Sequence, residues 1–136
     1  MTNGVPSVTD RLAACGLCLL LLVASSGASA AAGVQLWLQS SRLAGFRYYE
    51  GRALWPQLHE GDVLSLVRDR DNPWDRRAVR VEWQGHMLGY VPRSDNAVVA
   101  RLLDHGTHLR ARIVRLTRSR NPWQRVLFDI YEPMGR

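Results

Sequence analysis

Lysine is absent from this sequence: all 18 basic residues are arginines, set against 12 acidic residues. The formal net charge is +6 and the isoelectric point is about 10.3. Arg11 and Asp10 cancel, so residues 31–136 carry the whole excess. An arginine-only composition is also what a GC-rich genome produces. A basic balance of this size in a small chain is still the electrostatic footprint of a polyanion-binding protein.

Cysteine is scarce as well, because Cys15 and Cys18 are the only two in the chain. Residues 31–136 therefore form neither an internal disulfide nor a thiolate metal site. A segment of this length buries enough surface to be stable without such cross-links. We expect an ordinary hydrophobic core in a single domain.

Long apolar runs are also missing, apart from one near the N-terminus. The run from Leu12 to Ala24 has about the length of a signal-peptide core and is shorter than a membrane-spanning helix. Arg11 precedes it, and Ala28-Ser29-Ala30 matches a cleavage site. We predict a signal-peptide helix over residues 1–30, removed on export to the periplasm or the exterior. The alternative is an uncleaved membrane anchor.

Catalytic and cofactor motifs are missing too. The sequence has no GxGxxG, no GxxxxGK[ST] and no serine in a nucleophile elbow. A calcium loop starting at Asp69 would need glycine at Trp74 and glutamate at Arg80. His105 and His108 have the spacing of zinc ligands, but no cysteine accompanies them and carboxylates nearby are few. We expect no enzyme activity, no cofactor, no bound metal and no small-molecule substrate.

What the sequence does contain is a series of short strand patterns separated by turns. The residue pattern predicts five or six strands and one late helix, which favours a small barrel or half-open sheet. Residues 31–43 form either a linker or a lead-in strand, and residues 44–132 form the domain. The expected strands are 45–51, 63–67, 78–83, 87–91, 109–114 and 126–131, and the helix runs from a cap at Ser94 to Gly106.

Arg47-Tyr48-Tyr49 is the first candidate binding segment. If it is a strand, its side chains alternate, so that Arg47 and Tyr49 share one face and Tyr48 takes the other. One tyrosine is then expected in the core. The other would be a ring displayed on a sheet, where nucleic-acid bases stack.

Asn72-Pro73-Trp74-Asp75 is a turn by composition. Trp74 either folds back on the sheet or offers a second stacking ring. A carboxylate near a phosphate path is repulsive, so Asp75 would need a neutral donor such as a sugar hydroxyl.

The segment from Leu109 to Leu127 contains arginines and no acidic residue. It is either a solvated basic face or a rim that follows phosphates. The candidate rim residues are Arg110, Arg112, Arg118 and Arg120.

Four pieces, taken together in order and spacing, resemble the HIRAN domain family over about residues 44–132. They are Gly45-Phe46-Arg47-Tyr48-Tyr49, Gly61-Asp62-x-Leu64-x-Leu66-Val67-Arg68, Asn72-Pro73-Trp74-Asp75-x-x-Ala78-Val79-x-Val81 and Leu88-Gly89-Tyr90-Val91-Pro92-Arg93. The resemblance implies a mainly β fold with one helix, a small OB-like or SH3-like β-barrel of about six strands.

The resemblance also implies binding of single-stranded DNA at a free 3′ end. Tyr48 would stack on a base, Arg47 would contact a phosphate or base, and Asp75 would accept from the 3′-hydroxyl. Trp74 stands where the family usually has tyrosine and is still a flat ring. Tyr90 and Arg93 would line the same groove, and Tyr49 completes the predicted site.

A different function on the same barrel is the alternative. In that case the domain is an interaction module of the cell envelope that binds a peptide, a glycan or another anion. A membrane partner is expected only if the N-terminal segment is not cleaved.

Overall fold

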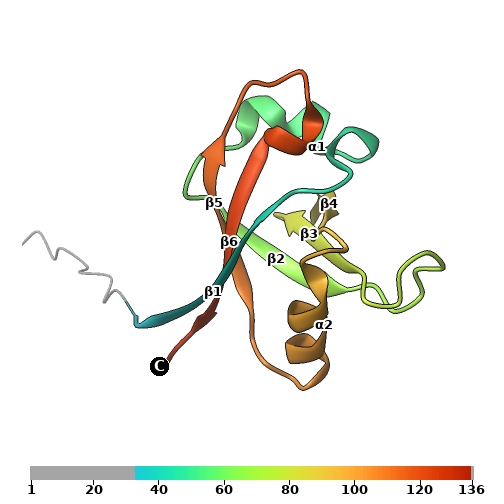
Figure 1. Cartoon of the computed structure of the whole chain (residues 1–136). Coiled ribbons are helices and arrows are strands. Elements are labelled where there is room, and N and C mark those ends of the chain that lie inside the picture. The colour runs from blue at the N-terminus through green and yellow to red at the C-terminus, as the bar shows by residue number, and fades with distance from the viewer. Residues whose placement is uncertain (1–32, 136) are drawn as a thin grey trace, which may run out of the picture. The chain divides into compact units, whose positions relative to one another are not determined.

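The computed structural model describes residues 33–135, so the predicted signal peptide lies outside the described residues. Six antiparallel strands form one sheet in the order β1-β6-β5-β2-β3-β4 (Figure 1). They are β1 (Gln35–Arg42), β2 (Val63–Arg68), β3 (Val79–Trp83), β4 (His86–Tyr90), β5 (Arg110–Leu116) and β6 (Val126–Pro133). The mainly β prediction is confirmed. Residues 31–43 were expected to be either a linker or a lead-in strand, and β1 lies within them and pairs with β6.

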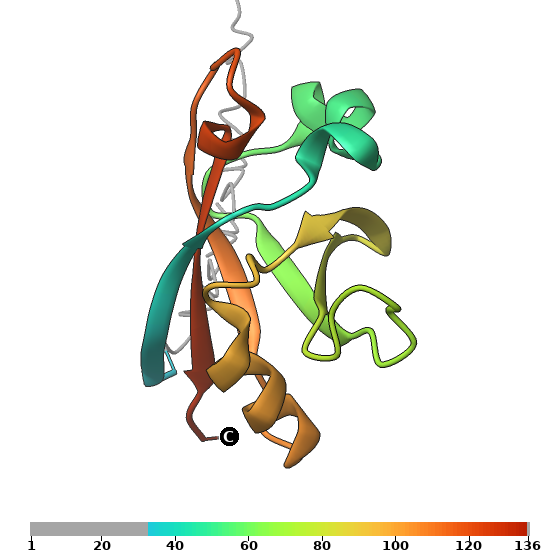
Figure 2. The same ribbon diagram turned by 45° about the vertical axis from the view of Figure 1, so that its right-hand side comes forward.

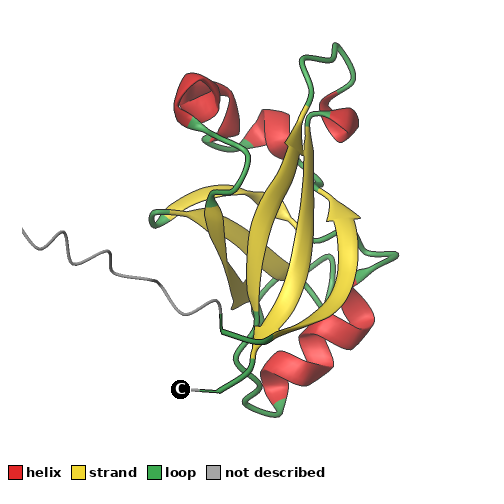
Figure 3. Ribbon diagram, turned by 90° about the vertical axis from the view of Figure 1, so that its left-hand side faces the viewer, coloured by secondary structure: helices red, strands yellow, loops and turns green. Residues whose placement is uncertain are grey.

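The helices are short and lie at two ends of the sheet (Figure 3). α2 (Asn96–Asp104) is at one end, and α1 (Gly51–Leu54) is at the other with three 3-10 turns. These turns are η1 (Phe46–Tyr48), η2 (Trp55–Gln57) and η3 (Pro122–Gln124). The prediction of a single helix is corrected by α1. Within residues 33–135 no helix is both long and apolar enough to cross a membrane.

The sheet is open, so the half-open sheet is right of the two alternatives that the residue pattern left, and the closed barrel implied by the resemblance is corrected. Among the described residues, an isolated bridge between Ala44, which follows the edge strand β1, and Tyr90 of the other edge strand, β4, joins the two edges. Each of these residues donates its backbone N–H to the other's carbonyl at 2.9 Å. Gly89 permits this approach, because a Cβ there would lie 2.2 Å from the Ala44 carbonyl oxygen. The edges therefore touch at one point and do not form a continuous ladder.

The core lies on the inner face of the curved sheet and follows the alternation of the strands. Val79, Val81 and Trp83 of β3 are buried, as are Phe128 and Ile130 of β6. Each fully buried side chain of this size contributes about 1.5–3 kcal/mol relative to an exposed one. This core supports the loops that carry the candidate site.

The predicted strand at residues 45–51 is wrong. Gly45 adopts a left-handed conformation at φ 77°, and Tyr48 donates its N–H to the Gly45 carbonyl at 2.9 Å, which turns the chain. Phe46 is the buried anchor of the turn, packing edge-on against Trp55 at 5.7 Å between ring centroids. Gly51 allows this packing, since a Cβ there would lie 2.4 Å from the Phe46 ring. Phe46 therefore takes the core position predicted for a tyrosine.

The helix prediction holds with a shifted start. α2 begins at Asn96 with Asp95 as the N-cap, not Ser94. The Ser94 hydroxyl instead donates to the Asp95 carboxylate at 2.7 Å. Ser41 and Gln39 of β1 hydrogen-bond to Asp95 as well. These contacts fix the beginning of α2 next to the loop that holds Asp75.

Candidate functional site

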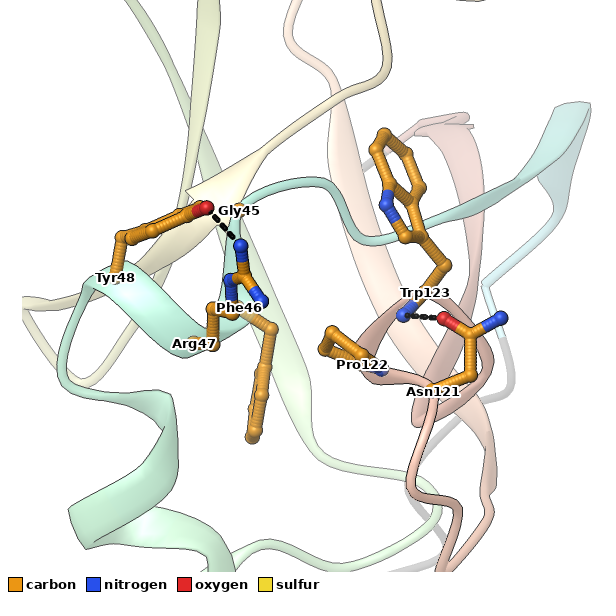
Figure 4. A pocket seen from close by; sticks show the side chains of 7 residues that line it. All are labelled: Gly45, Phe46, Arg47, Tyr48, Asn121, Pro122 and Trp123. Carbon is orange, nitrogen blue, oxygen red and sulfur yellow. Dashed lines mark hydrogen bonds between the residues drawn. The ribbon is translucent and has the colours of Figure 1, made fainter.

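A pocket of about 380 Å³ lies between η1 and η3, two segments far apart in the chain (Figure 4). Apolar and polar groups share its wall, which suits a ligand with a flat body and a charged edge. Its lining residues are Gly45, Phe46, Arg47, Tyr48, Asn121, Pro122 and Trp123.

Tyr48 displays its ring to solvent on the η1 side of this pocket, with 69% of the residue exposed. The Arg47 guanidinium lies 4.6 Å from the centroid of the ring and donates to the Tyr48 hydroxyl. An exposed ring beside a guanidinium provides both a stacking surface and a phosphate contact.

Trp123 stands on the η3 side and was not predicted from the sequence. The Asn121 side-chain oxygen accepts from the Trp123 N–H at 3.1 Å, and 51% of Trp123 is exposed. The missed signal is a repeated tripeptide, because Asn-Pro-Trp occurs at residues 72–74 and again at 121–123. The first copy has the same geometry, with Trp74 N 2.9 Å from the Asn72 oxygen.

Trp74 projects outward from the loop between β2 and β3, with 83% of the residue exposed. The Asn72 side-chain oxygen accepts from the backbone of both Trp74 and Asp75, which gives the tight turn predicted here. Of the two alternatives for Trp74, the displayed ring is the one observed.

Asp75 follows this turn and is only 17% exposed through its side chain. One carboxylate oxygen accepts from the Arg77 N–H at 2.9 Å, and the other accepts from the Asn96 side chain at 2.7 Å. The Arg93 Nε lies 3.8 Å from the second oxygen, and Arg93 Nη2 donates to the Trp74 carbonyl at 2.5 Å. Arg93 therefore ties β4's end to the Trp74 turn and places a cation beside the carboxylate.

Tyr90 and Tyr49 connect the two halves of the predicted site. Their rings are edge-to-face at 5.7 Å between centroids. The Tyr90 hydroxyl donates to the Asp69 carboxylate at 2.8 Å and lies 3.4 Å from the Asn72 amide nitrogen. Burial, and next the hydrogen bond to Asp69, raise the pKa of Tyr90 well above its ordinary value. Tyr90 therefore keeps its proton and remains a donor.

A chain of contacts links several of the predicted site residues. Tyr48 adjoins Tyr49, Tyr49 contacts Tyr90, and Tyr90 contacts the turn that carries Trp74. In Figure 2 the η1–α1 segment, β4 and the β2–β3 loop all lie toward the right of the view. We use the name aromatic face for the set of candidate site residues Arg47, Tyr48, Tyr49, Trp74, Asp75, Tyr90, Arg93 and Trp123.

The four rim arginines are not in one place. Arg118 and Arg120 line a hollow with Trp55 and Arg125, directly before η3. Arg112 lies in another hollow with Trp37 and Tyr131, its guanidinium 5.5 Å from the Tyr131 ring. Arg110 lines a third hollow with His108 and Pro133. Only Arg118 and Arg120 adjoin the aromatic face through the chain leading to Trp123.

A metal centre has no candidate in the part of the chain that the structure describes. There, no three side chains of His, Cys, Asp or Glu gather as ligands would. Asp69 and Asp75 are instead engaged by Tyr90 and by Asn96. The chemistry that the aromatic face offers is stacking, cation contact and hydrogen-bond acceptance.

Comparison with known proteins finds a family match over most of the chain. The sequence model of the family described as HIRAN domain matches residues 38–134. A putative SWI/SNF-related matrix-associated actin-dependent regulator of chromatin, subfamily A member 3-like 1, from Arabidopsis thaliana is 29% identical over 92 residues. That match covers 67% of this chain, which spans only 10% of the relative's length.

Two solved structures resemble the fold. A protein from Lactobacillus plantarum matches with a TM-score of 0.64 and 25% identity, covering 73% of this chain and 95% of that one. The HIRAN domain of human HLTF matches with a TM-score of 0.56 and 20% identity, covering 73% and 78%.

Proposed function

The chain belongs to the HIRAN domain family, and we propose that its aromatic face binds single-stranded nucleic acid, specifically DNA with a free 3′ end. The observation that carries this proposal is the pocket between η1 and η3. It sets two exposed rings, Tyr48 and Trp123, around the Arg47 guanidinium. Unpaired bases stack on such rings, and the guanidinium neutralises a phosphate.

The charge of the molecule supports a polyanionic ligand. The net charge of +6 resides in arginines, and Arg118 and Arg120 line a hollow shortly before Trp123 in the chain. Guanidinium groups in such positions track a phosphate backbone. The Arabidopsis relative is named as a putative regulator of chromatin, and chromatin contains DNA.

Asp75 supports recognition of the strand end. Each oxygen of its carboxylate accepts one hydrogen bond, and part of the side chain is still exposed to solvent. A terminal hydroxyl donates to a carboxylate, whereas a terminal phosphate is an anion and is repelled. Asp75 thus selects a free 3′-hydroxyl.

The test is binding of fluorescent single strands that differ only in the terminal group. We expect tighter binding of the 3′-hydroxyl strand than of the 3′-phosphate strand. Tyr48→Ala should weaken both by about 1–3 kcal/mol, because one stacking ring is lost. Heparin serves as a control for general polyanion attraction. Binding of heparin equal to that of DNA, unaffected by Tyr48→Ala, would contradict the proposal.

We also propose export of the protein, because residues 1–30 have the pattern of a signal peptide. The DNA bound would then be that present in the cell envelope or outside the cell. Fusion to a reporter that is active only outside the cytoplasm tests this. A fusion that stays inactive, although the protein accumulates, would place the domain inside the cell.

A further inference from the structure

Asn96, the first residue of α2, is a polar residue in a fully enclosed position, with 0% exposed. Its Nδ2 donates to the Asp75 Oδ2 at 2.7 Å, and its Oδ1 is buried with no hydrogen-bond partner among the described residues. Leaving a buried acceptor unpaired is unfavourable, and an apolar side chain would avoid the penalty. The penalty of the unpaired oxygen therefore has to be offset by what the amide nitrogen of Asn96 does.

The amide nitrogen of Asn96 makes the hydrogen bond to Asp75. A carboxylate only accepts, so the Asn96 side chain must present its nitrogen to Asp75 and turn its oxygen away. The opposite carboxylate oxygen is already fixed by the Arg77 N–H at 2.9 Å. The carboxylate is thus held from two sides, and both contacts lie within the protein.

We propose that Asn96 is the positioning residue of strand-end recognition: it orients the Asp75 carboxylate so that its exposed part receives the terminal hydroxyl. This rests on the proposed function, and it assigns a task to a residue that the ligand does not touch. Asp75 sits in a loop, and loop side chains without such support adopt several rotamers. Selectivity for the hydroxyl requires one orientation, which α2 supplies because its start is fixed by Ser41 and Gln39.

The experiment compares the ratio of dissociation constants for 3′-phosphate and 3′-hydroxyl strands in wild type, Asn96→Leu and a matched control. The control is Val99→Ala, because Val99 is also 0% exposed on α2 and its apolar side chain belongs to the hydrophobic core. For Asn96→Leu we expect the ratio to fall about tenfold, because the hydroxyl strand loses one oriented charge-assisted bond. The melting temperature should change by less than about 5 °C.

For Val99→Ala we expect the reverse pattern. A core cavity should lower the melting temperature by about 10 °C and leave the ratio unchanged. A purely structural Asn96 would behave like Val99, with a lower melting temperature and an unchanged ratio, and that result would overturn the inference while the proposed function stands. Wild-type protein that binds neither strand would instead remove the proposed function itself.

A measurement on the wild type keeps the inference testable if Asn96→Leu does not fold. The side-chain amide signal of Asn96 in a ¹H–¹⁵N spectrum reports the Asp75 hydrogen bond directly. We expect it to shift on adding the 3′-hydroxyl strand and to stay in place with the 3′-phosphate strand. An equal response to both strands, or no response to either despite binding, would contradict a positioning role.

Discussion

Tyr90 joins the two halves of the aromatic face through its ring and its hydroxyl. The ring meets Tyr49 and the hydroxyl donates to Asp69 at 2.8 Å. Because the structure favours the protonated phenol, Tyr90 stabilises the fold below its ordinary pKa of 10.0. As the pH rises above that value, the unfolded chain releases this proton before the folded one does, so the stabilisation declines.

The first residue-scale prediction follows from this loss of stability at high pH. Wild-type stability, measured by urea denaturation between pH 8 and about pH 11.5, should fall above pH 10 more steeply than that of Tyr90→Phe. Below pH 10 the Phe variant should be less stable by about 1–2 kcal/mol, because Asp69 loses a donor. Parallel pH profiles would show that folding does not raise the pKa of Tyr90.

The second residue-scale prediction concerns the two displayed indoles. Trp74→Ala and Trp123→Ala should each weaken single-strand binding by about 1–3 kcal/mol. Both residues are exposed, so folding stability should change by no more than about 0.5 kcal/mol. Trp37→Ala is the matched control, since Trp37 is 60% exposed but lies in the hollow with Arg112. Anisotropy titrations measure the affinity of each variant for the single strand. An equal loss of affinity in all three variants would mean that the effect is not specific to Trp74 and Trp123.

At the scale of elements, the bridge between Ala44, which follows β1, and the end of β4 brings η1 beside β4. The bridge between Ala44 and Tyr90 depends on Gly89, where any Cβ would overlap the Ala44 carbonyl oxygen. The backbone has to move apart to admit even a methyl group. This movement would displace the segment that carries Arg47 and Tyr48.

Gly89→Ala should therefore destabilise the domain by about 2–4 kcal/mol, as close-packed sites do. It should also weaken single-strand binding, in contrast with Gly61→Ala. Gly61 has a positive φ of 96° but open space where a Cβ would lie, so its substitution isolates the backbone strain of about 1 kcal/mol. Chemical denaturation measures the stability of both variants, and anisotropy titration measures their affinity for the single strand. Equal losses at the two glycines would show that the bridge has no special weight.

The Asn-Pro-Trp repeat is the other feature that belongs to this scale. Each copy makes the same side-chain-to-backbone bond and displays an indole. Local chemistry alone therefore builds these two turns, and the sequence contained the signal for both. Only the second copy lines the pocket with Tyr48, because η3 happens to pack beside η1.

At the scale of the whole molecule, the four candidate rim arginines lie in different parts of the surface. Arg118 and Arg120 stand near η3, whereas Arg110 and Arg112 line two other hollows. Only charges along the bound strand release counterions on binding. The net charge of +6 by itself attracts any polyanion and specifies no path.

The salt dependence of binding tests this division. Arg118→Gln and Arg120→Gln should each reduce the slope of log affinity against log salt by about 0.7 for a single strand. Arg110→Gln and Arg112→Gln should leave the slope unchanged. Binding titrations at several salt concentrations measure this slope. If all four substitutions reduced the slope equally, the strand would have to wrap around the domain.

The sequence by itself determined the features that depend on neighbours in the chain. Alternation in Val79-Arg80-Val81 fixed a strand and its buried face, because side chains of a strand point to opposite sides. Asn72-Pro73 fixed a turn, and the arginine-only charge fixed the basic character. The local sequence pattern predicted the wrong structure at residues 45–51, where aromatic residues typical of a strand form a 3-10 turn. The turn forms because Phe46 packs in the core against Trp55.

The tertiary structure decided which distant residues meet. Trp123 lines the same pocket as Tyr48, and Asn96 contacts Asp75, because the curved sheet places η3 beside η1 and α2 beside the β2–β3 loop. Those positions depend on strand order, which no local periodicity encodes. The sequence supplied the rings, the carboxylate and the cations, and packing of the whole chain arranged them into one face.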